Sequence, residues 1–322
     1  MKKLLLLFVS ALLLLGCERK SQNQNTSSND QPVAQPEVEV VEQPESEVED
    51  VELAVLGEGT LPIYVLSDEY GEKFLIINYF GSEKNPQPSE ELKNYKYVLY
   101  DGAYYPVVFK GFQLEDEANN SYRDTYFNFD NLPGWLFEME SGKLLENPVD
   151  DYDAIWDAPL LVDEQFKAEN VVYTLTNTPD GYPVRSDLSK ALQTAFEERY
   201  GRKIFDGWCG AIFGENNEYQ FVVIQFENKG TEALGVSALV KNGEIVAAIE
   251  QPAEWNEESV WRVDDGGEYG GISVDFATSK DGVLTLYTAN YGAEGTTYQT
   301  YVLEGNELVP GMVSADFYQA PM

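Results

Sequence analysis

Histidine is absent from all 322 residues of this chain. Its absence excludes Ser-His-Asp triads, Cys-His dyads, histidine zinc sites and histidine proton relays, because each of these needs an imidazole. The sequence also lacks GxSxG, P-loop and GxGxxG motifs, and it shows no cofactor-binding pattern. The sequence therefore favours a non-enzymatic protein, while chemistry based on carboxylates, tyrosine, lysine or a Ser-Lys pair stays open.

The apolar run near the start of the chain, residues 4–15, is too short to cross a bilayer. Twelve helical residues span about 18 Å, whereas the hydrocarbon core is about 30 Å thick. Lys2 and Lys3 precede the run and supply the positive charge that a secretory leader carries. This pattern predicts a cleavable signal peptide over residues 1–16.

The end of that run, Leu14-Leu15-Gly16-Cys17, resembles the lipobox of bacterial lipoproteins. The resemblance implies that the thiol of Cys17 receives a diacylglycerol, that signal peptidase II cleaves before it, and that lipid chains hold the protein at a membrane. Glu18 follows in place of the Asp that is typical of inner-membrane retention in enteric bacteria. The implied location is the cell envelope, with the outer membrane favoured in a host with two membranes. A plain secreted protein is the alternative.

Residues 18–52 contain no aromatic side chain, ten acidic residues and two basic ones. Such a segment cannot bury enough apolar surface to offset the entropy of ordering. We expect residues 17–52 to comprise the lipidated cysteine and a disordered acidic tether that lifts the folded part off the bilayer. An acidic segment that attracts a basic binding partner is the alternative interpretation.

Basic residues are few, with 21 Lys and Arg against 56 Asp and Glu, and the net charge is −35. A field of this sign disfavours nucleic acid and direct adhesion to anionic lipid. Basic proteins, divalent cations and neutral sugars remain open as ligands. Only two cysteines are present, and lipid on Cys17 would leave Cys209 without a disulfide partner. Because Cys209 lies in an apolar stretch with no base to activate it, we expect a buried structural thiol.

Short runs of β-branched and aromatic residues recur between glycine turns, which predicts antiparallel meanders and hairpins. The clearest runs are 74–77, 97–100, 107–109, 221–224 and 284–287. Asn242-Gly243 predicts a type I′ hairpin, because both residues tolerate positive φ. Apolar residues at spacings of three and four predict one main amphipathic helix at about 186–200, capped by Ser186 or Asp187 and stopped by Gly201.

The predicted fold class is therefore a β-rich α+β fold. A polar stretch at 163–170 suggests a division into a β-rich module, 53–165, and a helix-plus-meander module, 166–322. One continuous domain, 53–322, is the alternative.

Two acidic loops are weak candidates for calcium, which prefers oxygen ligands at alternate positions. The candidate ligands are Asp151, Asp153 and Asp157 in the first loop, and Asp264, Asp265 and Glu268 in the second. The first loop lacks the glycine and terminal glutamate of an EF-hand, so a solvated acidic loop is its favoured interpretation. A long hairpin loop explains the second stretch equally well.

The aromatic content is high, with 21 Tyr, 16 Phe and 5 Trp. Tyr95, Tyr97, Tyr104 and Tyr105 lie near one predicted turn, where exposed rings could bind sugars or peptides. Packing in the core or across strands is the favoured interpretation of most aromatic residues in the strands. The leading hypothesis is a membrane-anchored, non-enzymatic protein that binds another macromolecule or serves the envelope. A carbohydrate-binding or carbohydrate-hydrolysing lipoprotein is the alternative, and a calcium-stabilised adhesion module is a weaker one.

Overall fold

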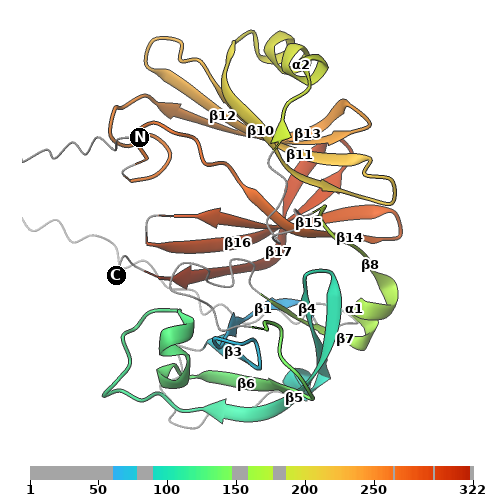
Figure 1. Ribbon diagram of the computed structural model, residues 1–322, viewed down its shortest axis with the longest axis vertical. Helices are drawn as coiled ribbons and strands as arrows, with labels where there is room; N and C mark the ends of the chain where they lie inside the picture. Colours follow the sequence, from blue (N-terminus) through green and yellow to red (C-terminus); the bar gives the residue numbers. More distant parts are fainter. Residues whose placement is uncertain are drawn as a thin grey trace, which may run out of the picture. The chain divides into compact units, whose positions relative to one another are not determined.

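The computed structural model describes residues 61–77, 90–146, 159–176, 186–263, 265–292 and 294–319. All of them belong to one compact unit, Ala54–Met322. Strands dominate, and neighbouring strands in each sheet run antiparallel, which confirms the predicted β-rich α+β fold (Figure 1). In the part of the chain that is described, none of the helices has the length and apolar character needed to cross a bilayer.

The first sheet closes on itself. Its strand order is β1-β7-β4-β5-β6-β3-β2, and only Val65 separates the two end strands β1 and β2 along the chain. The bounds are β1 Ile63–Tyr64, β2 Leu66–Ser67, β3 Lys73–Ile77, β4 Tyr95–Tyr100, β5 Ala103–Gln113, β6 Gly134–Met139 and β7 Leu160–Asp163. We call it the closed sheet.

Strand β5 provides the bend that this closure requires. Its first residues pair with β4, and its later residues pair with β6. A bulge between Phe109 and Gly111 marks the later half, and bulges are the usual means by which a strand turns sharply. The side chains gathered inside are mostly large and apolar, namely Val65, Phe74, Leu92, Tyr95, Val98, Val107, Phe137, Met139 and Leu161.

Two five-stranded sheets follow. The outer sheet has the order β13-β12-β11-β10-β9, and the middle sheet has the order β17-β16-β15-β14-β8. The outer strands are β9 Ser186–Asp187, β10 Ile204–Phe213, β11 Tyr219–Phe226, β12 Glu232–Lys241 and β13 Glu244–Glu254. The middle strands are β8 Val171–Tyr173, β14 Ser273–Lys280, β15 Val283–Tyr291, β16 Gly295–Glu304 and β17 Glu307–Tyr318.

The predicted hairpin at Asn242-Gly243 joins β12 to β13. The φ angles are 52° at Asn242 and 85° at Gly243, as a type I′ turn needs. Lys241 and Glu244 pair directly across the two-residue loop. The turn therefore fixes the register of the longest pairing in the outer sheet.

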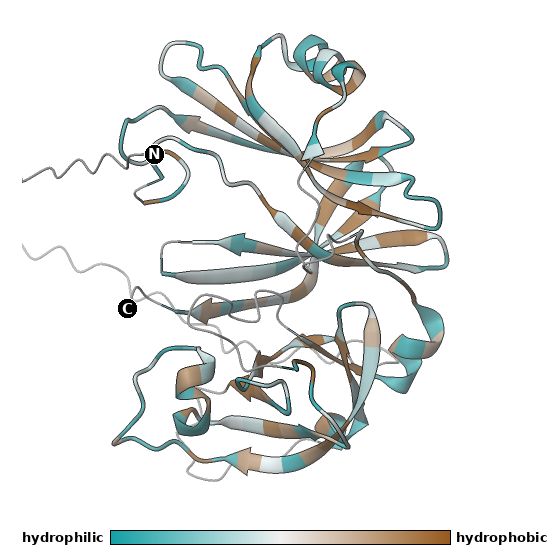
Figure 2. Ribbon diagram, viewed as in Figure 1, coloured by the Kyte–Doolittle hydropathy of each residue, from teal (hydrophilic) through white to brown (hydrophobic). Residues whose placement is uncertain are grey.

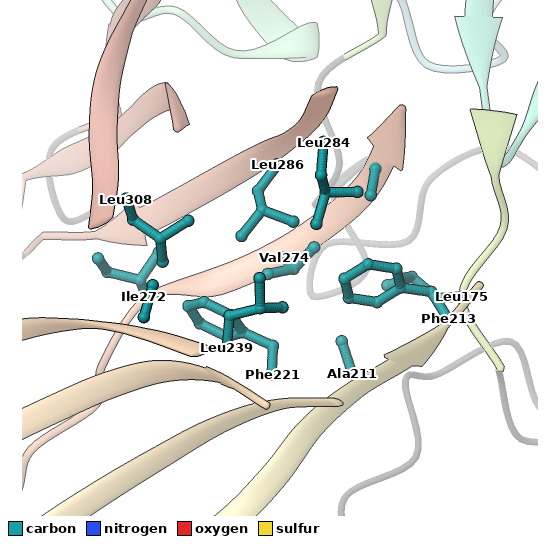
Figure 3. Close-up of a cluster of buried hydrophobic side chains, with 12 residues drawn as sticks. Leu175, Ala211, Phe213, Phe221, Leu239, Ile272, Val274, Leu284, Leu286 and Leu308 are labelled. Atoms are coloured by element: carbon teal, nitrogen blue, oxygen red, sulfur yellow. The ribbon is translucent and has the colours of Figure 1, made fainter. Parts of the chain in front are cut away.

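The middle sheet is buried on both faces. One face packs on the outer sheet, where apolar side chains of the two sheets interdigitate (Figure 3). Phe213, Phe221 and Leu239 of the outer sheet meet Val274, Leu284 and Leu286 of the middle sheet. Figure 2 shows hydrophobic and hydrophilic residues alternating along many of these strands, as expected where one face of a strand is buried.

The other face of the middle sheet packs on the closed sheet through aromatic side chains. Tyr64 of β1 lies 4.9 Å from Tyr298 of β16, measured between ring centroids. Phe276 of β14 and Tyr287 of β15 stack at 4.3 Å. Leu99, Leu160 and Val162 complete this core from the side of the closed sheet.

Helix α2, Lys190–Tyr200, covers the remaining face of the outer sheet (Figure 1). It begins later than the predicted 186, because Ser186 and Asp187 pair with β10 as strand β9. Ser189 is the cap instead, and its Oγ accepts a hydrogen bond from the N–H of Leu192 at 3.2 Å. Gly201 ends the helix in the left-handed conformation, as predicted, with φ 59°.

Among the described residues, three shorter helices lie in the connections, two within the closed sheet and one between the closed sheet and the middle sheet. These are η1 Glu90–Asn94, η2 Tyr126–Asn131 and α1 Glu164–Glu169. The chain passes from β7 of the closed sheet to β8 of the middle sheet across α1, which lies within the polar stretch 163–170. Asp163 caps α1 by accepting a hydrogen bond from the N–H of Phe166 at 2.7 Å.

Candidate functional site

Most of the predicted site residues lie outside the described part of the chain. These are Cys17, Asp151, Asp153, Asp157 and Asp264. Lipidation and the first calcium loop therefore stay predictions. The second loop is described through Asp265 and Glu268, and its geometry shows how a carboxylate is used there.

Asp265 organises the loop between β13 and β14. Only 9% of the residue is exposed, and its carboxylate accepts four backbone hydrogen bonds. Oδ1 accepts from Val260 at 3.0 Å and Gly267 at 2.8 Å, and Oδ2 accepts from Trp261 at 2.7 Å and Arg262 at 2.8 Å. A buried carboxylate with this many donors holds the backbone in place.

These hydrogen bonds also set the acidity of the group. Burial by itself raises the pKa of Asp265, but the four N–H donors outweigh it and leave the pKa below its ordinary value. Glu268, by contrast, is exposed. Among the described residues, no three acidic or cysteine side chains come together in a way that could hold a metal ion.

A buried polar network fixes the same loop to the outer sheet. Gln225 of β11 donates to the carbonyl oxygen of Gly267 at 2.7 Å, and its Oε1 accepts from the N–H of Tyr269 at 3.0 Å. The Tyr269 hydroxyl contacts Ser237 of β12 at 3.0 Å and donates to Gln251 of β13. Because the loop is tied to three neighbouring strands, it acts as a fixed part of the sandwich.

The predicted tyrosine pairs are used inside the fold. Tyr97 and Tyr104 meet edge to face at 6.1 Å, and Nζ of Lys167 lies 3.8 Å from the centroid of the Tyr97 ring. Tyr95 is buried, and Tyr105 is half-buried against the core of the closed sheet. Since an amine already covers the Tyr97 ring, this group is not an open platform for a ligand.

Cys209 is buried, as predicted. Its thiol donates to the carbonyl oxygen of Ala211 at 3.4 Å, and burial raises its pKa, which disfavours the reactive thiolate. It lies at the edge of a depression of about 220 Å³ beside the start of α2. That volume is below the roughly 300–1,000 Å³ of typical ligand pockets. Its one carboxylate comes from Asp187.

A surface that sequence reasoning missed lies on residues 114–131, between β5 and β6 (Figure 1). This loop reaches the last strand of the middle sheet. The N–H of Asp124 donates to the carbonyl oxygen of Tyr318 at 2.6 Å, and Oδ2 of Asp124 accepts from the N–H of Tyr318 at 2.8 Å. Asp124 is only 2% exposed, so this junction is a buried joint between the closed sheet and the middle sheet.

Amide side chains hold the loop from within. Asn128 is buried, and its Nδ2 donates to Oδ1 of Asn120 at 2.8 Å and to the carbonyl oxygen of Arg123 at 2.9 Å. Oδ1 of Asn120 also accepts from the N–H of Tyr122 at 2.8 Å. Tyr122 adopts a left-handed φ of 57°, which is costly for a bulky residue, at about 1–2 kcal/mol.

Three aromatic side chains project from this region into solvent. Tyr122 is 59% exposed, Phe127 57% and Tyr318 48%. Tyr122 and Phe127 lie two and three residues from Asp124, and Tyr318 is the partner of Asp124 in the junction. We call these three residues the aromatic surface. The sequence signal for the aromatic surface is the presence of aromatic residues among many Asn and Asp in 114–131. Asn and Asp favour turns, and a loop made of turns lies outside the core.

Comparison of the chain with protein-family models, curated proteins and solved structures gives no significant match. The chemistry of the residues themselves therefore carries the functional proposal.

Substitution of Asp265 by Asn tests the organising role of this carboxylate. Loss of the charge weakens four hydrogen bonds, so we expect the free energy of unfolding at pH 7 to fall by about 1.5–3 kcal/mol. Because the folded pKa is lowered, the stabilisation is present above the unfolded pKa of about 3.9 and is lost as the pH falls through the folded value. The difference between the two proteins in urea unfolding should therefore shrink below about pH 4.

Glu268→Gln in the same loop is the matched control. It removes an exposed carboxylate, so the change in stability should stay within about 0.5 kcal/mol. Equal losses in the two variants, or a loss in Asp265→Asn that does not vary with pH, would contradict the assignment.

Proposed function

We propose that this chain is a lipid-anchored protein of the bacterial cell envelope and that Ala54–Met322 is a non-enzymatic binding domain. The anchor is supported by Leu14-Leu15-Gly16-Cys17, which resembles a lipobox after an apolar run too short to span a bilayer. Glu18 favours the outer membrane where the host has two membranes. The 35-residue segment 18–52, poor in apolar groups, suits a tether.

The observation that carries the binding proposal is the aromatic surface. Tyr122 and Phe127 are exposed on the 114–131 loop, which the buried Asn128 and the Asp124–Tyr318 junction hold in place, and Tyr318 is exposed at the end of β17. Aromatic side chains are enriched at interaction sites, and a prearranged surface loses little entropy on binding. The left-handed backbone of Tyr122 also supports a binding role, since strained residues concentrate at functional sites.

Carbohydrate binding is the second candidate function. Tyrosine rings can pack against sugars and offer a hydroxyl for hydrogen bonding, and Tyr122 and Tyr318 both present exposed rings. Hydrolysis has less support among the described residues. A glycosidase needs two carboxylates across the scissile bond, and the depression beside α2 has Asp187 alone.

The anchor is tested by replacing Cys17 with Ser and growing the producing bacterium with labelled palmitate. The variant should lose the label and remain uncleaved, because a hydroxyl cannot replace the thiol that accepts the diacylglycerol. Cys209→Ser is the matched control and should keep the label, because that thiol is buried. A labelled Cys17→Ser protein would overturn the anchor.

The binding proposal is tested with the full chain in detergent on peptide and glycan arrays. We expect a ligand whose capture is lost when Tyr122 and Phe127 are both replaced by Ala. Phe205→Ala, which removes an exposed ring from β10, is the control and should leave capture unchanged. Capture that survives the double substitution would place binding elsewhere and contradict the proposal.

A further inference from the structure

We infer that the aromatic surface binds an arginine-rich polypeptide segment, an inference that rests on the proposed binding function and names its partner. Outside the buried Asp124, residues 114–131 carry Glu115, Asp116, Glu117 and Asp130 against a single basic residue, Arg123, and within the described part of the chain only Asp130 of these four has a nearby lysine, Lys73 at 3.9 Å. The rings therefore lie in a negative field.

Carboxylates also flank the ring that comes from the middle sheet. Asp316 precedes Tyr318 by two residues on β17, and both are exposed, so they project from the same side of the strand. Exposed Glu294 is next to the end of that strand, because its carbonyl oxygen accepts from the N–H of Gln319 at 2.7 Å. Acidic residues therefore lie near the rings in both segments that carry them, the 114–131 loop and β17.

A guanidinium group can contact both the exposed rings and the carboxylates of this surface. It stacks on an aromatic face, and its planar N–H groups pair with a carboxylate in bidentate fashion. Lysine makes the charge contact but stacks less well, because its ammonium is compact and strongly hydrated. An arginine-rich segment is therefore a better fit than a lysine-rich one.

The charge of the chain argues against the other occupants. Nucleic acid and anionic lipid are repelled by a net charge of −35, and so is a second copy of the same chain. A neutral sugar gains no long-range attraction from the carboxylates, and Phe127 offers it no hydrogen bond. The carboxylates attract a cationic segment at long range, and the rings and carboxylates contact its guanidinium groups at short range.

The test is fluorescence anisotropy of labelled nona-arginine with the full chain in detergent, at a fixed salt concentration near 150 mM, where long-range attraction is largely screened. We expect saturable binding that is several-fold weaker for nona-lysine and absent for nona-glutamate. The Tyr122→Ala and Phe127→Ala variants should each raise the Kd about fivefold, which corresponds to about 1 kcal/mol.

Three control variants separate contacts with the rings from electrostatic attraction by the acidic residues, since none of them changes the net charge of the protein. Tyr122→Phe keeps a ring and should retain most of the affinity, because the ring face and not the hydroxyl makes the contact. Phe205→Ala lies outside the surface and should have no effect. Asn119→Ala removes a polar side chain from the loop and should also leave the Kd within twofold.

Two results would overturn the inference. One is nona-arginine binding that is the same in Tyr122→Ala, Phe127→Ala and the parent protein, because the contact would then be unspecific charge attraction. The other is capture of a glycan or an uncharged peptide on the arrays that depends on Tyr122 and Phe127 while nona-arginine does not bind. In that second case the binding function stands and only the cationic partner is wrong.

Discussion

Two-sided burial of the middle sheet is the constraint on which the rest of the fold depends. One of its faces provides half of the core shared with the outer sheet, and the other packs against Tyr64 and its neighbours in the closed sheet. Two buried threonines inside this sheet satisfy their hydroxyls with backbone hydrogen bonds. Thr288 donates to the carbonyl oxygen of Gln299 at 2.7 Å, and Thr300 donates to that of Val313 at 3.1 Å. Neither neighbouring sheet could lose the middle one without exposing a large apolar face.

The aromatic surface follows from this arrangement. Tyr122 and Phe127 belong to a loop of the closed sheet, whereas Tyr318 belongs to the middle sheet. The Asp124–Tyr318 junction joins the two segments that carry these rings, and the junction in turn depends on the packing of the two sheets. Binding and folding are therefore linked: a change that loosens this packing would also separate the rings, even if it touched none of them.

The sequence predicts local features well because local chemistry decides them. Alternating apolar runs specify strands, and Asn242-Gly243 and Gly201 specify a turn and a helix end. Features that depend on distant partners were missed. The helix starts at Lys190 rather than near Ser186 because β10 takes Ser186 and Asp187 into the sheet. Burial of Asp265 cannot be read from its neighbours, and Asp124 and Tyr318 are 194 positions apart.

The central claim is that the middle sheet joins its neighbours into one cooperative body. Hydrogen exchange of the full chain, measured by mass spectrometry across a urea series, tests it most directly. We expect peptides covering β6 of the closed sheet and β11 of the outer sheet to lose protection at the same urea concentration, as a single two-state unfolding unit requires. Loss of protection in β6 at a clearly lower urea concentration, with β11 still protected, would contradict it.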